Sequence, residues 1–397
     1  MKRKKLSVLF SMVLLFVAFA AQPCMAADAK AIKIGGLFAL TGFGSAAETF
    51  AAQGAELAVD YFNEKGGIDI KGEKYKLRLI AEDIKGTADG AAAAANKLLY
   101  DDKVQFTVGT VVPFMVQAAG TVLEPAQVVR VVMYNCGLPN EYGAHTPYMF
   151  VAQDATVEGI DPSLDYLKEA YPGAKSISYV IPDDGSAPVL GPIFTKKAEK
   201  KGYKVASIEK WAMNTQDFTP VVMKILQSKP DAIAFANGWP QATGGMLKIA
   251  REMGFKGPIF GCNYDDGYQI LQVAGKEASN DFFVHSLVLD SPEMTPLIKM
   301  IVERAKKKYG EAYVTTVWGF QTVYVLVQAI EKAQSLDPTV VKNTWEKMEA
   351  IDTVYGPGKM GGMKTYGINH TICHPCPIQA LKNGEVSWVK WVDVYSE

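Results

Sequence analysis

Residues 32–67 read IKIGGLFALTGFGSAAETFAAQGAELAVDYFNEKGG and predict one complete structural unit. The apolar run at 32–37 is typical of a buried β-strand. A turn containing glycine follows it, and residues 46–65 then place their aliphatic and aromatic side chains on one broad helical face. The glycines of EKGG end that helix. Such a strand–turn–helix unit is the building block of a parallel sheet covered by helices.

The turn contains the pattern G-x-G-x-x-A, formed by Gly42, Gly44 and Ala47. This pattern can mark the phosphate loop of a dinucleotide site, which also needs an acidic residue about 20 positions further on. The acids at the end of the next expected strand, Glu82 and Asp83, lie about 40 positions after Gly42. We therefore interpret the glycines as permitting a tight turn and a close approach of the backbone to another group.

Residues 1–26 have the three parts of a secretory signal peptide. Four basic residues at 2–5 precede an apolar run at 6–21, and the small-residue sequence CMA follows. The apolar run is shorter than the ~20 residues that a membrane-spanning helix needs. A lipid anchor on Cys24 is the alternative, but Pro23 stands where lipoprotein signals have a small residue. We expect cleavage after the signal and a soluble protein in the periplasm.

Without the signal peptide the chain has 37 basic and 42 acidic residues. This balance argues against a nucleic-acid partner, which would need a concentrated basic face. The length suffices for two domains of ordinary size. The four cysteines beyond the signal are too few to make a disulfide scaffold of so long a chain. We therefore expect a packed hydrophobic core to stabilise the fold.

Short β-type runs alternate with amphipathic helical segments in two series, which indicates an α/β fold with parallel sheets. In the first series we predict strands at 32–37, 75–82, 106–108 and 128–133 and helices at 46–65, 88–100 and 114–124. In the second we predict strands at 176–181, 203–207, 232–236 and 259–260, the β run DFFVHSLVL, and helices at 159–171, 192–201, 219–228 and 242–253. Helices at 295–309, 317–333 and 338–348 follow, and then a hairpin that turns at Asn383-Gly384.

The helices after Asp290 have no sheet of their own, so we expect them to pack on the first series. The chain would then pass between two lobes near residues 150, 286 and 365. These crossings favour a hinge, so we predict two parallel-sheet lobes with a cleft between them. Lobe 1 would comprise 30–150 and 286–365, and lobe 2 would comprise 151–285 and 366–397.

The chain resembles the leucine/isoleucine/valine-binding family of periplasmic receptors for ABC transporters. Residues 32–68 are similar to that family's I-x-I-G…L-T/S-G turn and its G-A-x-L-A-V-x-x-x-N-x-x-G-G-I helix. LRLIAEDIKGTADGAAAAANKLL at 77–99 and QDFTPVVMKILQSKPDAIAF at 216–235 resemble its second strand and helix and a segment of its second lobe. The resemblance covers essentially the whole mature chain. It implies the α/β fold of a type I periplasmic binding protein, with two doubly wound parallel-sheet lobes joined by a three-crossover hinge. Such lobes close on a small ligand and hand it to a membrane permease.

Ligands of open α/β sheets bind outside the carboxyl ends of the strands. The positions that contact ligand in the resembled family fall on Pro113, near Gly137, near Ser186, on Trp239 and near Asn263, with Asp265 two residues further on. The family's usual hydroxyl and acidic groups are thus mostly replaced, which argues against a branched-chain amino acid as the ligand.

Aromatic and amide side chains stand in the expected strand-end loops instead. Such rings can sandwich a flat or aromatic ligand that a few amide hydrogen bonds orient, although packing of the lobes is the alternative role for each ring. The candidate ligand-binding residues are Phe43, Ala47, Pro113, Phe114, Tyr134, Asn135, Gly137, Ser186, Trp239, Asn263, Tyr264 and Asp265.

The segment NHTICHPCP at 369–377 collects His370, Cys373, His374 and Cys376. These are soft metal ligands, but no second ligand pair lies at zinc-finger spacing, and a β-type run follows where a redox Cys-x-x-Cys would open a helix. We favour a structural crossover segment and leave a Cys373–Cys376 disulfide open. An exported redox or metal-dependent enzyme that uses Cys373-His374-Pro375-Cys376 is the alternative function.

The sequence shows no nucleophile elbow, zinc-protease helix or nucleotide phosphate loop. We therefore expect no catalysis, no cofactor and no bound metal. The expected function is that of a monomeric periplasmic receptor of an ABC importer. Its expected partners are a membrane permease and a small ligand, either amino acid-like or an aromatic, carboxylic or amide compound, with no nucleic acid.

Overall fold

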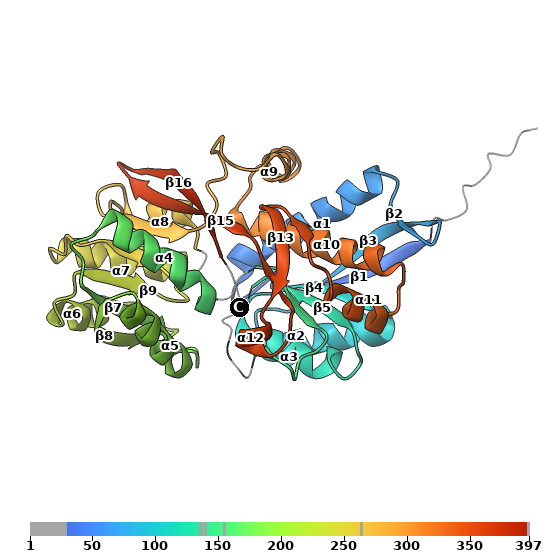
Figure 1. Cartoon of the computed structure of the whole chain (residues 1–397), viewed down its shortest axis with the longest axis horizontal. Coiled ribbons are helices and arrows are strands. Elements are labelled where there is room, and N and C mark those ends of the chain that lie inside the picture. Colours follow the sequence, from blue (N-terminus) through green and yellow to red (C-terminus); the bar gives the residue numbers. More distant parts are fainter. Residues whose placement is uncertain (1–29, 135–137, 139–140, 154–155, 263–264, 395–397) are drawn as a thin grey trace, which may run out of the picture.

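The computed structural model describes residues 30–134, 138, 141–153, 156–262 and 265–394. In this part of the chain two α/β lobes lie side by side, each with one sheet and helices packed on it (Figure 1). The predicted class of two mainly parallel sheets with alternating helices is confirmed. The described helices include none that is long and apolar enough to cross a membrane.

The sheet of lobe 1 has nine strands in the described residues, in the order β12-β13-β14-β6-β5-β4-β1-β3-β2. Its centre is parallel, and antiparallel pairs lie toward both edges. The strands are β1 Ala31–Phe38, β2 Ile68–Ile70, β3 Glu73–Asp83, β4 Phe106–Gly109, β5 Val129–Val132, β6 Met149–Val151, β12 Ile351–Thr353, β13 Gly356–Gly361 and β14 Thr371–Cys373.

The sheet of lobe 2 has seven described strands, in the order β16-β15-β11-β10-β9-β7-β8. The predicted hairpin is confirmed: it pairs β15 with β16 and turns at Asn383 and Gly384, which both have positive φ angles. The strands are β7 Ser176–Pro182, β8 Lys204–Trp211, β9 Ala232–Phe235, β10 Ile259–Gly261, β11 Phe282–His285, β15 Pro375–Lys382 and β16 Glu385–Asp393.

Several helices begin with a proline in the first turn, where the missing N–H costs no hydrogen bond. Lobe 1 carries α1 Ser45–Glu64, α2 Ala88–Asn96 with a π-helical turn at Lys97–Asp101, α3 Pro113–Leu123, α9 Pro296–Tyr309, α10 Val314–Ala333, α11 Pro338–Trp345 and α12 Met363–Tyr366. Lobe 2 carries α4 Thr156–Ala170, α5 Ala187–Lys200, α6 Thr219–Gln227, α7 Pro240–Glu252 and α8 Gly267–Ala274.

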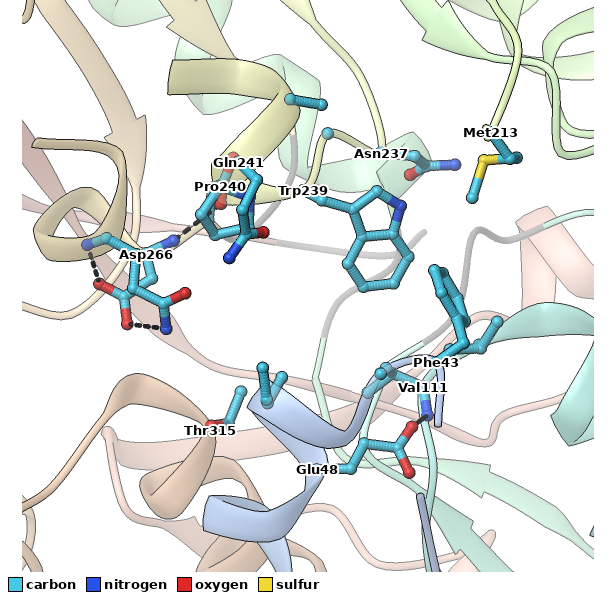
Figure 2. Close-up of a pocket in the computed structure, with 18 of the residues that line it drawn as sticks. Phe43, Glu48, Val111, Met213, Asn237, Trp239, Pro240, Gln241, Asp266 and Thr315 are labelled. Carbon is cyan, nitrogen blue, oxygen red and sulfur yellow. Dashed lines mark hydrogen bonds between the residues drawn. The ribbon is translucent and has the colours of Figure 1, made fainter. Parts of the chain in front are cut away.

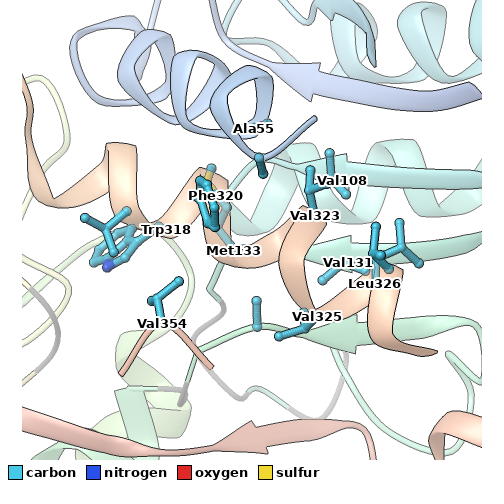
Figure 3. Packing of buried hydrophobic residues seen from close by; sticks show 14 of the residues in the cluster. Ala55, Val108, Val131, Met133, Trp318, Phe320, Val323, Val325, Leu326 and Val354 are labelled. Carbon is cyan, nitrogen blue, oxygen red and sulfur yellow. The ribbon is translucent and has the colours of Figure 1, made fainter. Parts of the chain in front are cut away.

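The helices after Asp290 pack on lobe 1, as predicted, and α10 lies directly against α1 (Figure 1). Two glycines let the helix backbones touch. A Cβ on Gly54 would lie 1.9 Å from the carbonyl oxygen of Thr316, and a Cβ on Gly319 would lie 1.8 Å from that of Ala51. Beneath this crossing, buried side chains of α10 such as Phe320 meet those of the sheet (Figure 3).

The chain passes between the sheets three times. The first passage follows β6, so the predicted boundary after residue 150 falls inside a strand, and the second follows the end of β11 at His285. The predicted boundary at 365/366 is wrong, because β14 pairs with β6 and β13 and so still belongs to lobe 1. In the third passage, His374 alone separates β14 from β15.

Candidate functional site

A cleft of about 590 Å³ lies between the two lobes and is lined by both (Figure 2). Lobe 1 contributes the turn between β1 and α1, the start of α3, the residues after β5 and the start of α10. Lobe 2 contributes loops that follow β7, β8, β9 and β10. Most of these are carboxyl ends of strands, where open α/β sheets bind ligands. The cleft is therefore the candidate ligand site.

The glycine turn packs on its neighbours as a tight loop. Gly42 has φ 74°, and a Cβ there would lie 2.4 Å from the carbonyl oxygen of Lys85. Asp83, at the end of β3, accepts hydrogen bonds from the backbone N–H groups of Leu40 and Thr41 and from the Thr41 hydroxyl. The strand-end acid thus holds the turn itself, which agrees with the tight-turn interpretation rather than with a ribose-binding role.

Glu48, in the first turn of α1, lies buried at the lobe 1 wall. Its carboxylate accepts hydrogen bonds from the Ala39 N–H at 2.7 Å, the Thr110 hydroxyl at 2.9 Å and the Val111 N–H at 3.2 Å. Burial raises the pKa of Glu48 to about 7. Sequence reasoning missed this residue.

Two consecutive acids line the lobe 2 wall at the start of α8. Asp265 accepts from the Thr243 hydroxyl at 3.2 Å and from the Asp266 N–H at 2.9 Å, and burial raises its pKa to about 8. Asp266 caps α8 by accepting from the N–H groups of Tyr268 and Gln269, and burial raises its pKa as well. These carboxylates are held by neutral donors.

Aromatic rings meet across the cleft. Trp239, the residue before α7 in lobe 2, extends toward Phe43 of lobe 1, with ring centroids 5.1 Å apart and the rings edge to face (Figure 2). Trp239 also packs against the apolar cluster of lobe 1. On the α10 side, the rings of Tyr134 and Trp318 stack at 6.3 Å. The walls thus present flat apolar surfaces from both lobes.

Six of the predicted residues line the cleft: Phe43, Ala47, Pro113, Tyr134, Trp239 and Asp265. That they contact a ligand stays a prediction. Asn135, Gly137, Asn263 and Tyr264 lie outside the described residues. Phe114 is not among the residues that line the cleft; its half-exposed ring lies 6.3 Å from the ring of Phe43.

Ser186 is a correction to the predicted set. It is buried beneath the wall rather than at its surface, since its hydroxyl donates to Asp184 and accepts from the side-chain amide of Asn237. The structure brings the two partners to the cleft instead. Further lining residues that sequence reasoning missed are Asp184, Trp211, Met213, Thr215, Gln216, Phe218, Asn237, Gln241, Asp266, Gln269, Thr315 and Trp318.

The histidines of the 369–377 segment have structural partners. Nδ1 of His370 lies 2.9 Å from the Met149 carbonyl oxygen and its Nε2 lies 2.6 Å from Glu346, while Nε2 of His374 lies 3.0 Å from the Gln153 amide oxygen. Together with Lys342, His370 holds the pKa of Glu346 down at about 2, against the opposing effect of burial.

The cysteines of this segment, Cys373 and Cys376, are buried thiols without a disulfide. In the described residues no three His, Cys, Asp or Glu side chains are grouped to hold a metal ion, and no residue of 369–377 lines the cleft. The segment therefore fits the crossover role that we favoured.

Comparisons with known proteins agree with this architecture. Residues 31–385 match the sequence model of a family described as periplasmic binding protein. The chain is 26% identical over 344 residues to Leu/Ile/Val-binding protein homolog 3 of Brucella melitensis, covering 86% of this chain and 90% of that protein.

Solved structures share the fold. A branched-chain amino acid transporter substrate-binding protein of Streptococcus pneumoniae, in complex with isoleucine, superimposes with a TM-score of 0.75 at 23% identity, covering 92% of this chain and 100% of that one. An ABC-transporter solute-binding protein of Rhodopseudomonas palustris, in complex with 3,4-dihydroxybenzoic acid, superimposes with a TM-score of 0.74 at 18% identity, covering 92% and 98%.

Proposed function

Because the chain belongs to the periplasmic binding protein family, we propose that it is the extracytoplasmic solute receptor of an ABC importer. The receptor would capture a small molecule between its lobes and deliver it to a membrane permease. The observation that carries this proposal is the cleft between the lobes, whose walls come from strand-end loops of both.

The mechanism rests on contacts that need both lobes. Phe43 and Trp239 approach each other from opposite walls, so a ligand held by both rings is bound fully only when the lobes are together. Binding then shifts the population of open and closed forms toward the closed one. The closed form would present a joined surface of the two lobes to the permease.

The cleft is large enough for a ligand of amino acid or monocyclic size. Its amides, Asn237, Gln216 and Gln241, supply hydrogen bonds that orient a polar group, and its rings cover an apolar one. The related proteins named above bind isoleucine and an aromatic acid, which supports a ligand of similar dimensions. Export by the signal at 1–26 and a monomeric state are part of the same proposal.

The 369–377 segment supports a hinge rather than an enzyme. Its histidines are hydrogen-bonded to Glu346 and Gln153, and its thiols are buried. Binding without turnover is therefore the activity that we propose.

A thermal-shift screen of the mature protein tests the proposal. The panel would contain amino acids, aromatic acids, short-chain carboxylates, amides and amines. A true ligand raises the melting temperature with concentration and adds about 2.7 kcal/mol of stability at one hundred times its Kd. A compound that is converted while nothing in the panel stabilises the protein would contradict receptor function.

A further inference from the structure

The cleft carries acidic groups with no basic side chain to balance them. Its described lining contains Glu48, Asp184, Asp265 and Asp266 but no Lys, Arg or His. The internal positions outside the described residues are 135–137, 139–140, 154–155 and 263–264, and their sequence contains no basic residue either. No side chain of these parts can therefore offer a positive charge to a bound anion.

The buried acids are also held without a cation inside the protein. Glu48 faces two backbone N–H groups and the Thr110 hydroxyl. Asp265 faces the Thr243 hydroxyl from α7 and the neighbouring Asp266, and its backbone oxygen accepts from Gln379 of β15. A buried carboxylate with only neutral donors is costly to ionise, which agrees with the raised pKa values of Glu48 and Asp265. A cation in the cleft would remove that cost.

Helix N-termini are the remaining source of positive charge for an anionic ligand, at about half an elementary charge each. Of those beside the cleft, α8 is capped by Asp266, which accepts its first N–H groups, and α1 carries the acid Glu48 in its first turn. Both α3 and α7 begin with proline, so each of these N-termini has one N–H group fewer to donate. The cleft thus favours a cationic ligand over an anionic one.

The aromatic lining points the same way. Phe43, Trp211, Phe218 and Trp239 present rings to the cleft from both lobes. Ring faces attract organic cations, and the interaction strengthens when water is excluded. Aromatic rings combined with uncompensated carboxylates form the chemistry that recognises ammonium and amidinium groups.

We propose, building on the receptor function above, that the ligand is an organic cation: an ammonium or amidinium group on a small apolar or aromatic skeleton. The cationic group lies toward Asp265 and Asp266, and the skeleton lies against the paired rings of Phe43 and Trp239. A carboxylate on the ligand adds nothing to affinity.

Matched probes test the charge directly. Calorimetry and thermal shift on the mature protein would compare benzylamine, benzoate and benzamide, and isoamylamine, isovalerate and isovaleramide, with leucine as the zwitterion. We expect an amine to bind at least about tenfold more tightly than the carboxylate and amide of the same skeleton. A carboxylate, an amide or leucine that binds more tightly than its amine overturns the inference but leaves the receptor function intact. The inference is also overturned if none of these seven compounds binds and an uncharged or anionic compound of the wider panel does.

Two variants locate the charge. Asp265→Asn keeps both hydrogen bonds possible, and Asp266→Asn keeps a good helix cap, so both are expected to fold. Each should weaken amine binding about tenfold, whereas Asp183→Asn, an exposed acid paired with Lys210 outside the cleft, should not change it. Wild-type affinity for benzylamine should rise from pH 6.0 to 8.5 as the acids ionise, with proton release on binding. An affinity that falls over this range, or variants that bind amines normally, would overturn the proposal.

Discussion

The two walls of the cleft differ in what they present to a ligand. The lobe 1 wall is built mainly of small and apolar residues around Phe43, and its acid, Glu48, is tied to three donors of its own lobe. The lobe 2 wall is richer in polar side chains: Asp184, Thr215, Gln216, Asn237, Gln241, Asp265, Asp266 and Gln269. We infer that lobe 1 sets the shape of the site and lobe 2 selects the polar group of the ligand.

The elements that form and support the two walls explain why their lining residues differ. Behind the lobe 1 wall, α1 and α10 are in backbone contact at Gly54 and Gly319, which fixes the wall in place. The lobe 2 wall consists mostly of loops that follow four parallel strands, with the first turns of α7 and α8. Side chains on such loops vary without disturbing the core.

Enlarging Gly54 should have the largest effect. In Gly54→Leu the new side chain would meet the Thr316 carbonyl, so we expect a loss of more than about 3 kcal/mol in the free energy of unfolding, or no folded protein. Urea denaturation measures it. Gly173→Leu is the matched control, since a Cβ there has nothing within 4 Å. Equal stabilities for the two variants would contradict a rigid lobe 1 wall.

The charge of Asp265 should appear as a pH dependence of stability. Its pKa is raised in the folded state from 3.8 to about 8, so the folded protein binds the extra proton between these values, and stability falls as the pH rises. Relative to Asp265→Asn, the unfolding free energy of the ligand-free wild type should fall by up to about 1.4 kcal/mol per pH unit from pH 5 to 7.5. If the difference in unfolding free energy between the wild type and Asp265→Asn stays constant across this range, the pKa of Asp265 is not raised by burial and its carboxyl group is solvated.

Removing the indole of Trp239 should cut ligand affinity by more than about tenfold without unfolding the protein, because the ring covers the ligand from lobe 2. Calorimetry with the compound found by screening measures it. Trp391→Ala, on β16 and outside the cleft lining, is the control for losing an indole. An unchanged Kd for the Trp239 variant would remove this residue from the site.

Phe114→Ala should have the smallest effect, with a change in Kd of less than about threefold. The ring is 43% exposed and is not part of the cleft lining. A loss as large as that of Trp239→Ala would mean that the site extends past Phe43 to the rim of lobe 1.

The sequence predicted the regular parts of the fold well. Long periodic segments such as α1 and α10 and the Asn-Gly hairpin carry strong local signals. The short strands β2, β6 and β12 were missed because three residues are too few to show a period; among the described strands, β2 and β12 each pair only with the strand that follows in the chain. The misplaced third boundary has the same cause, since β14 is equally short.

The candidate site was predicted less completely. Residues at obvious strand ends, such as Phe43, Trp239 and Asp265, do line the cleft. Ser186 does not, because it is buried and its hydroxyl is hydrogen-bonded to Asp184 and Asn237, which no local pattern reveals. Glu48 was missed because a charged residue in the first turn of a helix is usually a solvated one, and only the meeting of the β1–α1 turn with the loop after β4 buries it.

The link at His374 limits how the lobes can move. With one residue between β14 and β15, and with the φ angle of Pro375 locked by its ring, very few backbone torsions remain at this passage. We therefore expect the lobes to rotate about this link rather than to slide apart along it. Rotation about this link would separate the lobes least beside His374 and most at a distance from it.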